Sequence, residues 1–217
     1  MPIFECSQCN EMTYSATEEA LRPCERCGSE RQRVVEGDFD RARRTRRDLG
    51  PGDHAVLVHD DPAAVAPFCA RFLGDGVARG ERVFAGVPDD LRQAIGAELP
   101  AELERAIEWA GSSTFYGDFD AEGVASTWEA LVLEEPRGAR ILAGLDRSRA
   151  EGVEAEELAR YEAIAHGLIT RLGATVLCAF DTTALPPALI EVAMRSHGLV
   201  IEDGGALRNE RFEYQPA

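Results

Sequence analysis

The sequence predicts an α/β protein with a mostly parallel sheet and helices on both faces, preceded by a small N-terminal module that contains four cysteines. From residue 54 onward, nearly continuous apolar runs alternate with amphipathic segments, as in parallel sheets joined by crossover helices. Before residue 28 stand two CxxC pairs, a spacing typical of metal-binding modules. The length of 217 residues fits one ordinary domain with a small appendage.

The N-terminal module, residues 1–36, is predicted to be a zinc ribbon. Its CxxC pairs are separated by 14 residues, and the turn within each pair lets two sulfurs reach one tetrahedral ion. The N-terminus shows no basic segment followed by an apolar run, and we find no apolar stretch of about 18 residues, so we expect a cytoplasmic protein with no membrane partner. Thiols stay reduced in that compartment, which favours a structural Zn²⁺ over disulfides. The predicted zinc ligands are Cys6, Cys9, Cys24 and Cys27.

Residues 37–50 are predicted to form an arginine-rich connector helix that ends at a Gly-Pro-Gly turn. One interpretation is a solvated helix that docks on the acidic body of the protein. The alternative is a basic handle for nucleic acid or for an acidic partner protein. The residues that would make this contact are Arg41, Arg43, Arg44, Arg46 and Arg47.

Residues 51–217 are predicted to be the α/β body, in which strands and helices alternate. The expected strands are 54–60, 82–88, 104–110, 139–146 and 174–181, followed by a hairpin over 198–214 that turns at Asp203-Gly204-Gly205. The expected helices are 61–80, 89–99, 119–135, 155–173 and 186–196.

Polar side chains follow several of these strands at the point where each strand ends. In open parallel sheets, ligands bind outside the carboxyl ends of the strands. We therefore expect a ligand site near His59, Asp60, Asp146 and Asp181. The alternative is that each aspartate only caps the helix or turn that follows it. Because residues 48–217 carry a net charge of −16, the site favours a small uncharged or cationic molecule, or a partner segment, over nucleotides and acidic metabolites.

The turn after the first body strand argues against nucleotide hydrolysis. It reads VHDDPAAVAP, with neither the glycines nor the lysine of a phosphate loop, and the whole sequence contains no lysine. The four histidines show no spacing typical of metal ligands, and Cys69 and Cys178 are expected to be buried thiols. We expect no catalytic residues; an enzyme that uses His59, Asp146 and Asp181 is the least favoured hypothesis.

Five segments, in their order and spacing, resemble the MEDS family of sensory domains. They are 50-GPGDHAVLVHDD-61, 79-RGERVFAGVP-88, 161-YE-162, 176-VLCAFD-181 and 195-RSHGLVIEDGG-205. The resemblance implies a RecA/KaiC-like fold without a phosphate loop, and a role in sensing small molecules within transcriptional or signalling control. It carries over to Gly52, Asp53, His54, Glu162, Cys178, Asp181 and His197, from which His54 and His197 join the predicted ligand-binding residues.

Together these features predict a non-catalytic sensory or regulatory protein, in which the body binds a small molecule or a regulatory protein and the ribbon holds a structural zinc. The alternative is a nucleic-acid-associated transcriptional regulator that uses the ribbon and the arginine block.

Overall fold

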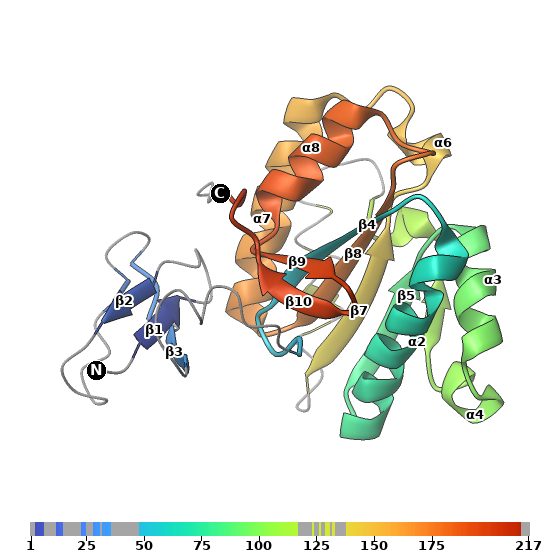
Figure 1. The fold of residues 1–217 in the computed structure, drawn as a ribbon, viewed down its shortest axis with the longest axis horizontal. Helices are drawn as coiled ribbons and strands as arrows, with labels where there is room; N and C mark the ends of the chain where they lie inside the picture. Colours follow the sequence, from blue (N-terminus) through green and yellow to red (C-terminus); the bar gives the residue numbers. More distant parts are fainter. Residues whose placement is uncertain are drawn as a thin grey trace.

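The structure is a computed structural model that contains two separate sheets (Figure 1). It describes residues 3–6, 12–14, 23–24, 28–30, 32–35, 48–116, 123, 126, 129–130, 132 and 138–213. The arginine block at 41–47 lies outside the described residues, as does most of the helix expected over 119–135.

The large sheet has seven strands in the order β10-β9-β4-β8-β7-β5-β6. All neighbouring strands are parallel except β9 and β10, which are antiparallel. This confirms the predicted α/β class with a mostly parallel sheet. The strands are β4 (His54–His59), β5 (Arg82–Gly86), β6 (Glu108–Ala110), β7 (Ala139–Gly144), β8 (Thr175–Asp181), β9 (Leu199–Glu202) and β10 (Gly205–Arg208).

Helices connect these strands, and residues that favour helix caps mark several of their ends. Asp61 caps the first long helix by accepting a hydrogen bond from the backbone of Ala63, and left-handed glycines, Gly80 and Gly173, end the two long helices. The described helices are α2 (Pro62–Arg79), α3 (Asp89–Glu98), α4 (Ala101–Glu104), α6 (Arg147–Ala150), α7 (Ala155–Leu172) and α8 (Pro187–Ser196), with a 3₁₀ turn over Ser112–Thr114.

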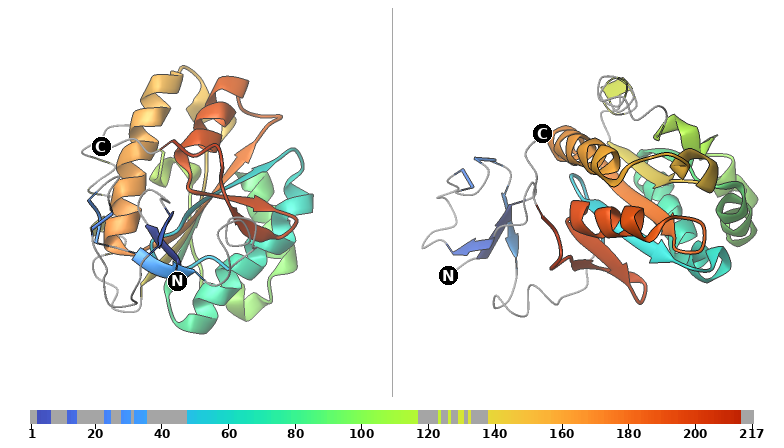
Figure 2. Two further views of the ribbon diagram at one scale, coloured as in Figure 1. Left: turned by 60° about the vertical axis from the view of Figure 1, so that its left-hand side comes forward. Right: turned by 90° about the horizontal axis from the view of Figure 1, so that it is seen from above.

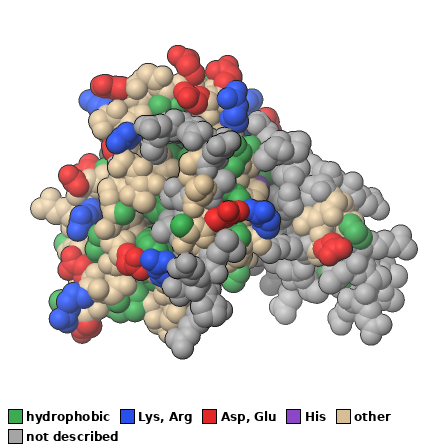
Figure 3. Space-filling view, turned by 180° about the vertical axis from the view of Figure 1, so that it is seen from behind, with side chains coloured by type: hydrophobic (Ala, Val, Ile, Leu, Met, Phe, Trp, Pro, Cys, Tyr) green, Lys and Arg blue, Asp and Glu red, His purple; other side chains and the backbone are tan. Residues whose placement is uncertain are grey.

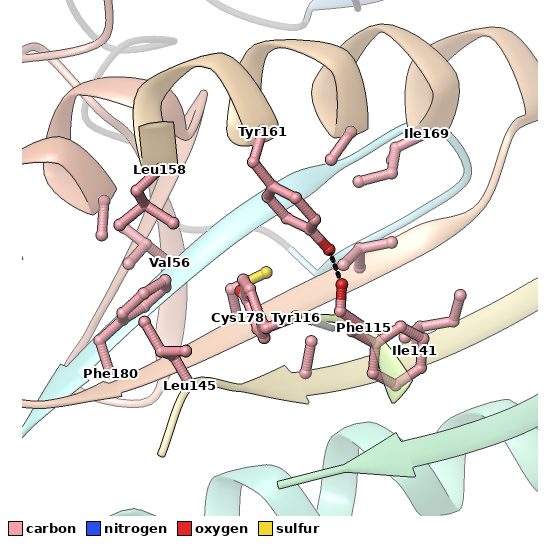
Figure 4. Packing of buried hydrophobic residues seen from close by; sticks show 14 of the residues in the cluster. Val56, Phe115, Tyr116, Ile141, Leu145, Leu158, Tyr161, Ile169, Cys178 and Phe180 are labelled. Carbon is pink, nitrogen blue, oxygen red and sulfur yellow. Dashed lines mark hydrogen bonds between the residues drawn. The ribbon is translucent and has the colours of Figure 1, made fainter. Parts of the chain in front are cut away.

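Helices cover the large sheet on both faces (Figure 2). On one face, α2 and α3 pack against Leu57 and Ala179; on the other, α7 and α8 pack against Val56 and Cys178. Figure 4 shows the second core, in which the hydroxyl of Tyr161 on α7 donates to the carbonyl of Phe115. Because successive strand residues point to opposite faces, odd- and even-numbered residues of β4 belong to different cores.

The last two described strands, β9 and β10, form the predicted hairpin. Asp203 and Gly204 connect β9 to β10 with positive φ angles of 44° and 75°. Two positive φ angles in a two-residue turn match the twist of the flanking strands, which explains the Asp-Gly sequence at this point. Gly205 belongs to β10 rather than to the turn.

The small sheet lies near the N-terminus and contains three antiparallel strands in the order β2-β1-β3. Its strands are β1 (Ile3–Cys6), β2 (Met12–Tyr14) and β3 (Gln32–Val35). The sequence favours strands at β2, within the segment MTYSA, and at β3, within the alternating segment RQRVVE, but shows no such pattern at β1.

Candidate functional site

A cavity of about 190 Å³ lies at the carboxyl ends of β4 and β8 and beside the segment that follows β7. We call it the carboxyl-edge cavity. Three of the predicted ligand-binding residues, which follow or end different strands, reach it together. It is lined by His59, Pro88, Asp90, Leu91, Leu145, Asp146, Arg147, Ala179, Asp181 and Ala184.

The topology of the sheet explains why this cavity forms where it does. β4 and β8 are neighbours, and their last residues, His59 and Asp181, stand opposite each other. The chain leaves β4 through α2 on one face towards β5, and leaves β8 through α8 on the other face towards β9. The two connections diverge at this point, which is the switch point where open α/β sheets bind ligands.

His59 supplies the polar group of the cavity that has no protein partner. Its Nδ1 atom is buried and makes no hydrogen bond to any described residue. Burial lowers the pKa of His59 below 6.5, although nearby carboxylates, Asp181 foremost, act in the opposite direction. A neutral imidazole with an unused nitrogen can donate or accept one hydrogen bond to a molecule in the cavity.

The two aspartates of the cavity also cap the turns that follow them. Asp146 Oδ1 accepts from the backbone of Arg149 at 2.9 Å and from Ser148 Oγ at 2.6 Å. Asp181 Oδ1 accepts from the backbone and the hydroxyl of Thr183, both at 2.7 Å. Partial burial raises the pKa of Asp181, but these hydrogen bonds outweigh that effect and leave its pKa below 3.8. Capping and cavity lining thus occur in the same side chains, so the two interpretations are not exclusive.

The other predicted ligand-binding residues lie elsewhere. Asp60 is exposed and does not line the cavity. His54 begins β4, five positions before His59, and therefore lies at the opposite end of the strand and on the opposite face. His197 is buried at the end of α8, on the same side of the sheet as His54.

His54 and His197 belong to a second site, which we call the buried polar cluster: His54, Glu162, His166, Cys178 and His197, with Tyr116 beside them. Their rings and carboxylate are less than a tenth exposed, between β4, β8, α7 and the end of α8. The rings of His54 and His197 have centroids 3.9 Å apart. Figure 4 shows Cys178 and Tyr116 in this layer, beneath α7.

At the centre of this cluster, the Glu162 carboxylate faces two imidazoles without hydrogen-bonding to them, whereas Cys178 Sγ and His54 Nε2 are within hydrogen-bond range of each other. Glu162 Oε2 lies 3.7 Å from His54 Nε2 and 3.7 Å from His197 Nε2, and Cys178 Sγ lies 3.5 Å from His54 Nε2. The nitrogen–oxygen distances exceed those of hydrogen bonds. Glu162 Oε2 and His197 Nε2 are accordingly buried with no hydrogen-bond partner among the described residues.

Burial sets the charge of this cluster in the absence of any ion. It raises the pKa of Glu162 to about 8 and lowers the pKa of His197 to about 3. It also lowers the pKa of His54 and raises that of Cys178. Without an ion, the groups are therefore neutral near pH 7.

The loop that carries His197 is fixed by a residue downstream. Asn209 Nδ2 donates to the carbonyls of His197 at 2.8 Å and Met194 at 2.6 Å, and its backbone donates to Gly198 at 3.0 Å. Asn209 is itself buried. This clamp holds the end of α8 against the start of β9.

Sequence reasoning missed the composition of the buried polar cluster. The four histidines show no metal-ligand spacing in the sequence, because they come from different elements. Three of the four, His54, His166 and His197, nevertheless meet in space. One signal was available for Glu162: it stands within the apolar stripe of α7, four residues from Leu158 and from His166, which predicts burial of a carboxylate. Tyr116, Asp90 and Arg147 carried no such signal.

The N-terminal cysteines are described only in part. Cys6 ends β1 and Cys24 precedes a turn, and both are buried. Gly28 donates to the carbonyl of Cys24 at 2.7 Å with a positive φ of 72°, which is a tight turn. Cys9 and Cys27 lie outside the described residues, so the predicted zinc ribbon remains a prediction.

Arginines and carboxylates are interspersed on the surface of the body. Figure 3 shows both signs of charge beside each other on one face. Arg82 pairs with Glu108 at 2.8 Å, and Arg171 pairs with Glu129 at 2.9 Å. Arginines paired in this way offer little net attraction to phosphates. None of the described helices is both long and apolar enough to cross a lipid bilayer.

The sheet and its switch-point cavity define an α/β domain of the class that carries sites at the carboxyl ends of its strands. Within this class, the chain belongs to the MEDS family: the model of the MEthanogen/methylotroph, DcmR Sensory domain matches residues 53–198. Among solved structures, the chain is similar to the flagellar accessory protein FlaH from Methanocaldococcus jannaschii, with a TM-score of 0.49 and 11% identity over 77% of this chain and 84% of that chain. A search of curated proteins finds no match.

Proposed function

We propose that this MEDS domain is a non-catalytic sensor that takes a small uncharged or cationic molecule in the carboxyl-edge cavity. His59, which lines a cavity at the switch point of the sheet and whose Nδ1 has no hydrogen-bond partner among the described residues, carries this proposal. Apolar side chains such as Leu91 and Leu145 supply contact area, while His59 and the carboxylates orient the ligand and disfavour anions.

A binding screen on the full-length protein tests this proposal. Native mass spectrometry first reports any molecule that copurifies. A fixed panel of neutral, cationic and anionic small molecules is then tested by ligand-observed NMR. We expect neutral or cationic members to bind, and His59→Leu to weaken binding about tenfold because one buried hydrogen bond is lost.

The matched control is Asp60→Asn, which alters the adjacent residue outside the cavity and should bind as the wild type does. Binding that His59→Leu leaves unchanged, or a preference for anions, would move the ligand away from this cavity. A larger and more open hollow of about 450 Å³ between α2 and the β9–β10 hairpin would then be the next place to examine.

The proposal includes the absence of nucleotide hydrolysis. The turn between β4 and α2 has the sequence His-Asp-Asp-Pro, and its carboxylates oppose a bound phosphate. We expect phosphate release from ATP to stay at the background level in purified protein. A steady rate that survives purification and disappears in Asp60→Ala would contradict a non-catalytic role.

For the N-terminal segment, the proposal rests on the amino-acid sequence alone. The two CxxC pairs favour a structural zinc ribbon in residues 1–36, and the arginines at 41–47 favour nucleic acid or an acidic protein as a secondary partner. A gel shift at several salt concentrations tests the nucleic-acid alternative, because contacts to phosphates weaken steeply with salt. An affinity for DNA or RNA that is unchanged when the five arginines are replaced would reject this role for the block.

A further inference from the structure

The buried polar cluster has the composition of a metal site rather than of a hydrophobic core. Two imidazoles, a thiol and a carboxylate meet at one point, and one atom from each of His54, Cys178 and His197 falls within 4.8 Å of the other two. Gathering such groups away from water costs free energy unless something satisfies them. Two of the central atoms, Glu162 Oε2 and His197 Nε2, are unsatisfied.

We propose that the buried polar cluster binds one Zn²⁺ ion through His54 Nε2, His197 Nε2, Cys178 Sγ and the carboxylate of Glu162. This site is distinct from the carboxyl-edge cavity and from the predicted N-terminal ribbon. With four protein ligands it is closed, and its role is to fix the structure around it rather than to activate water.

The distances fit such an ion. Tetrahedral zinc about 2.1 Å from nitrogen or oxygen and about 2.3 Å from sulfur separates its ligand atoms by roughly 3.4–3.6 Å. Glu162 Oε2 lies 3.7 Å from each imidazole Nε2, and Cys178 Sγ lies 3.5 Å from His54 Nε2. These three distances are close to the edges of a coordination tetrahedron, and the ligand atoms of His54, Cys178 and His197 all lie within 4.8 Å of one another, near enough for one ion.

The outer atoms of the same residues orient them towards the centre. His197 Nδ1 lies 2.8 Å from the carbonyl of Ala193, so Nδ1 carries the proton and Nε2 has the lone pair. His54 Nδ1 faces His166 Nδ1 at 3.4 Å, and Glu162 Oε1 lies 3.5 Å from the hydroxyl of Tyr116. Partners on the far side of each ligand are the usual way in which proteins aim imidazoles and carboxylates at a metal.

The ion would join three parts of the body that are distant in the sequence. His54 and Cys178 come from adjacent strands, Glu162 from the middle of α7, and His197 from the end of α8. A shallow depression beside His166, bordered by Ser196 and Phe212, lies on the outer side of the cluster.

The test uses the full-length protein, stripped of metal and reloaded with zinc alone. Native mass spectrometry counts the bound ions in the wild type, Cys178→Ala, His197→Gln and Cys69→Ala. Cys69 is the matched control, because it is an equally buried thiol in the core on the other face of the sheet. We expect Cys178→Ala and His197→Gln to bind one zinc fewer than the wild type and Cys69→Ala. Equal zinc content in all four proteins would overturn the proposal.

A measurement on the wild type alone covers the case in which the variants do not fold. X-ray absorption at the zinc edge distinguishes sulfur at about 2.3 Å from nitrogen or oxygen at about 2.0–2.1 Å. A four-cysteine ribbon contributes sulfur only, so a mixed shell supports the proposed site. A shell of sulfur alone, or protein that retains no zinc, rejects it.

Discussion

The carboxyl-edge cavity and the buried polar cluster use the same residue types in opposite ways. In the cavity, Asp146 and Asp181 accept hydrogen bonds from the turns that follow them. The Nδ1 atom of His59 has no hydrogen-bond partner among the described residues, so it can bond to a ligand. In the cluster, the imidazoles and Glu162 are buried, and Glu162 Oε2 and His197 Nε2 face each other at 3.7 Å without a hydrogen bond. One sheet can therefore carry an open site at its edge and a closed site beneath a helix, because neighbouring strand residues point to opposite faces.

The largest expected effect is a difference in stability between two histidine variants, one at His197 in the buried polar cluster and one at His59 in the carboxyl-edge cavity. His197→Ala should lower the free energy of unfolding by about 3 kcal/mol in metal-free protein, because it leaves a cavity and an orphaned carbonyl at Ala193. His59→Ala should cost about 1 kcal/mol, because the imidazole already borders a cavity. Urea denaturation followed by circular dichroism measures both.

Zinc should affect the stability of the same two variants differently. Zinc should raise the melting temperature of His59→Ala as it does that of the wild type, because the cluster is intact in both. His197→Ala should lose part of this response. Equal costs for the two substitutions, with equal zinc responses, would mean that the sites do not differ as described.

A smaller effect is expected from the capping role of the cavity aspartates. Asp146→Ala and Asp181→Ala should each lower the free energy of unfolding by about 1 kcal/mol, because each removes hydrogen bonds to following backbone amides. Asp60→Ala is the control and should change stability by less than about 0.5 kcal/mol, because it is exposed. A cost for Asp60→Ala equal to that of the other two would show that general charge, and not capping, is responsible.

The smallest effect concerns the ionisation of His59. Its pKa should lie below 6.5, so below that pH the unfolded chain binds more protons than the folded protein at this residue, and His59 makes stability fall as the pH is lowered. Asp181→Asn should lower the pKa further, because the carboxylate favours the imidazolium. NMR titration of the imidazole resonances measures both values. An increase of the pKa in Asp181→Asn would show that the carboxylate does not face the ring.

Much of the fold was predictable, because it follows from periodicity and turn chemistry. β7 and β8 are nearly continuous apolar runs, as is typical of strands buried on both faces, and Asp203-Gly204 supplies the two positive φ angles of the hairpin turn. The α/β class is confirmed for the same reason. The strand β1 was missed, because four residues next to a cysteine pair show no alternation of their own.

The site was predictable only where one rule of topology applies. The carboxyl ends of parallel strands share an edge, which brought His59, Asp146 and Asp181 together in advance. The resemblance drew His54 and His197 to attention but gave no contact between them. The contact between His54 and His197 depends on how α7 and the end of α8 pack against the start of β4. The spacing of residues along the chain does not predict this packing.

The clamp formed by Asn209 bears on where this domain ends. The family match stops at residue 198, yet β9, β10 and Asn209 lie beyond it and hold the loop of His197 and the outer side of β4. A chain trimmed to the matched segment would leave the backbone of β4 unpaired at Ala55 and Val56, where it now bonds Leu199 and Val200. Open strand edges pair readily with other chains, so such a fragment should aggregate. The folded unit thus extends beyond the matched segment by at least the hairpin and Asn209.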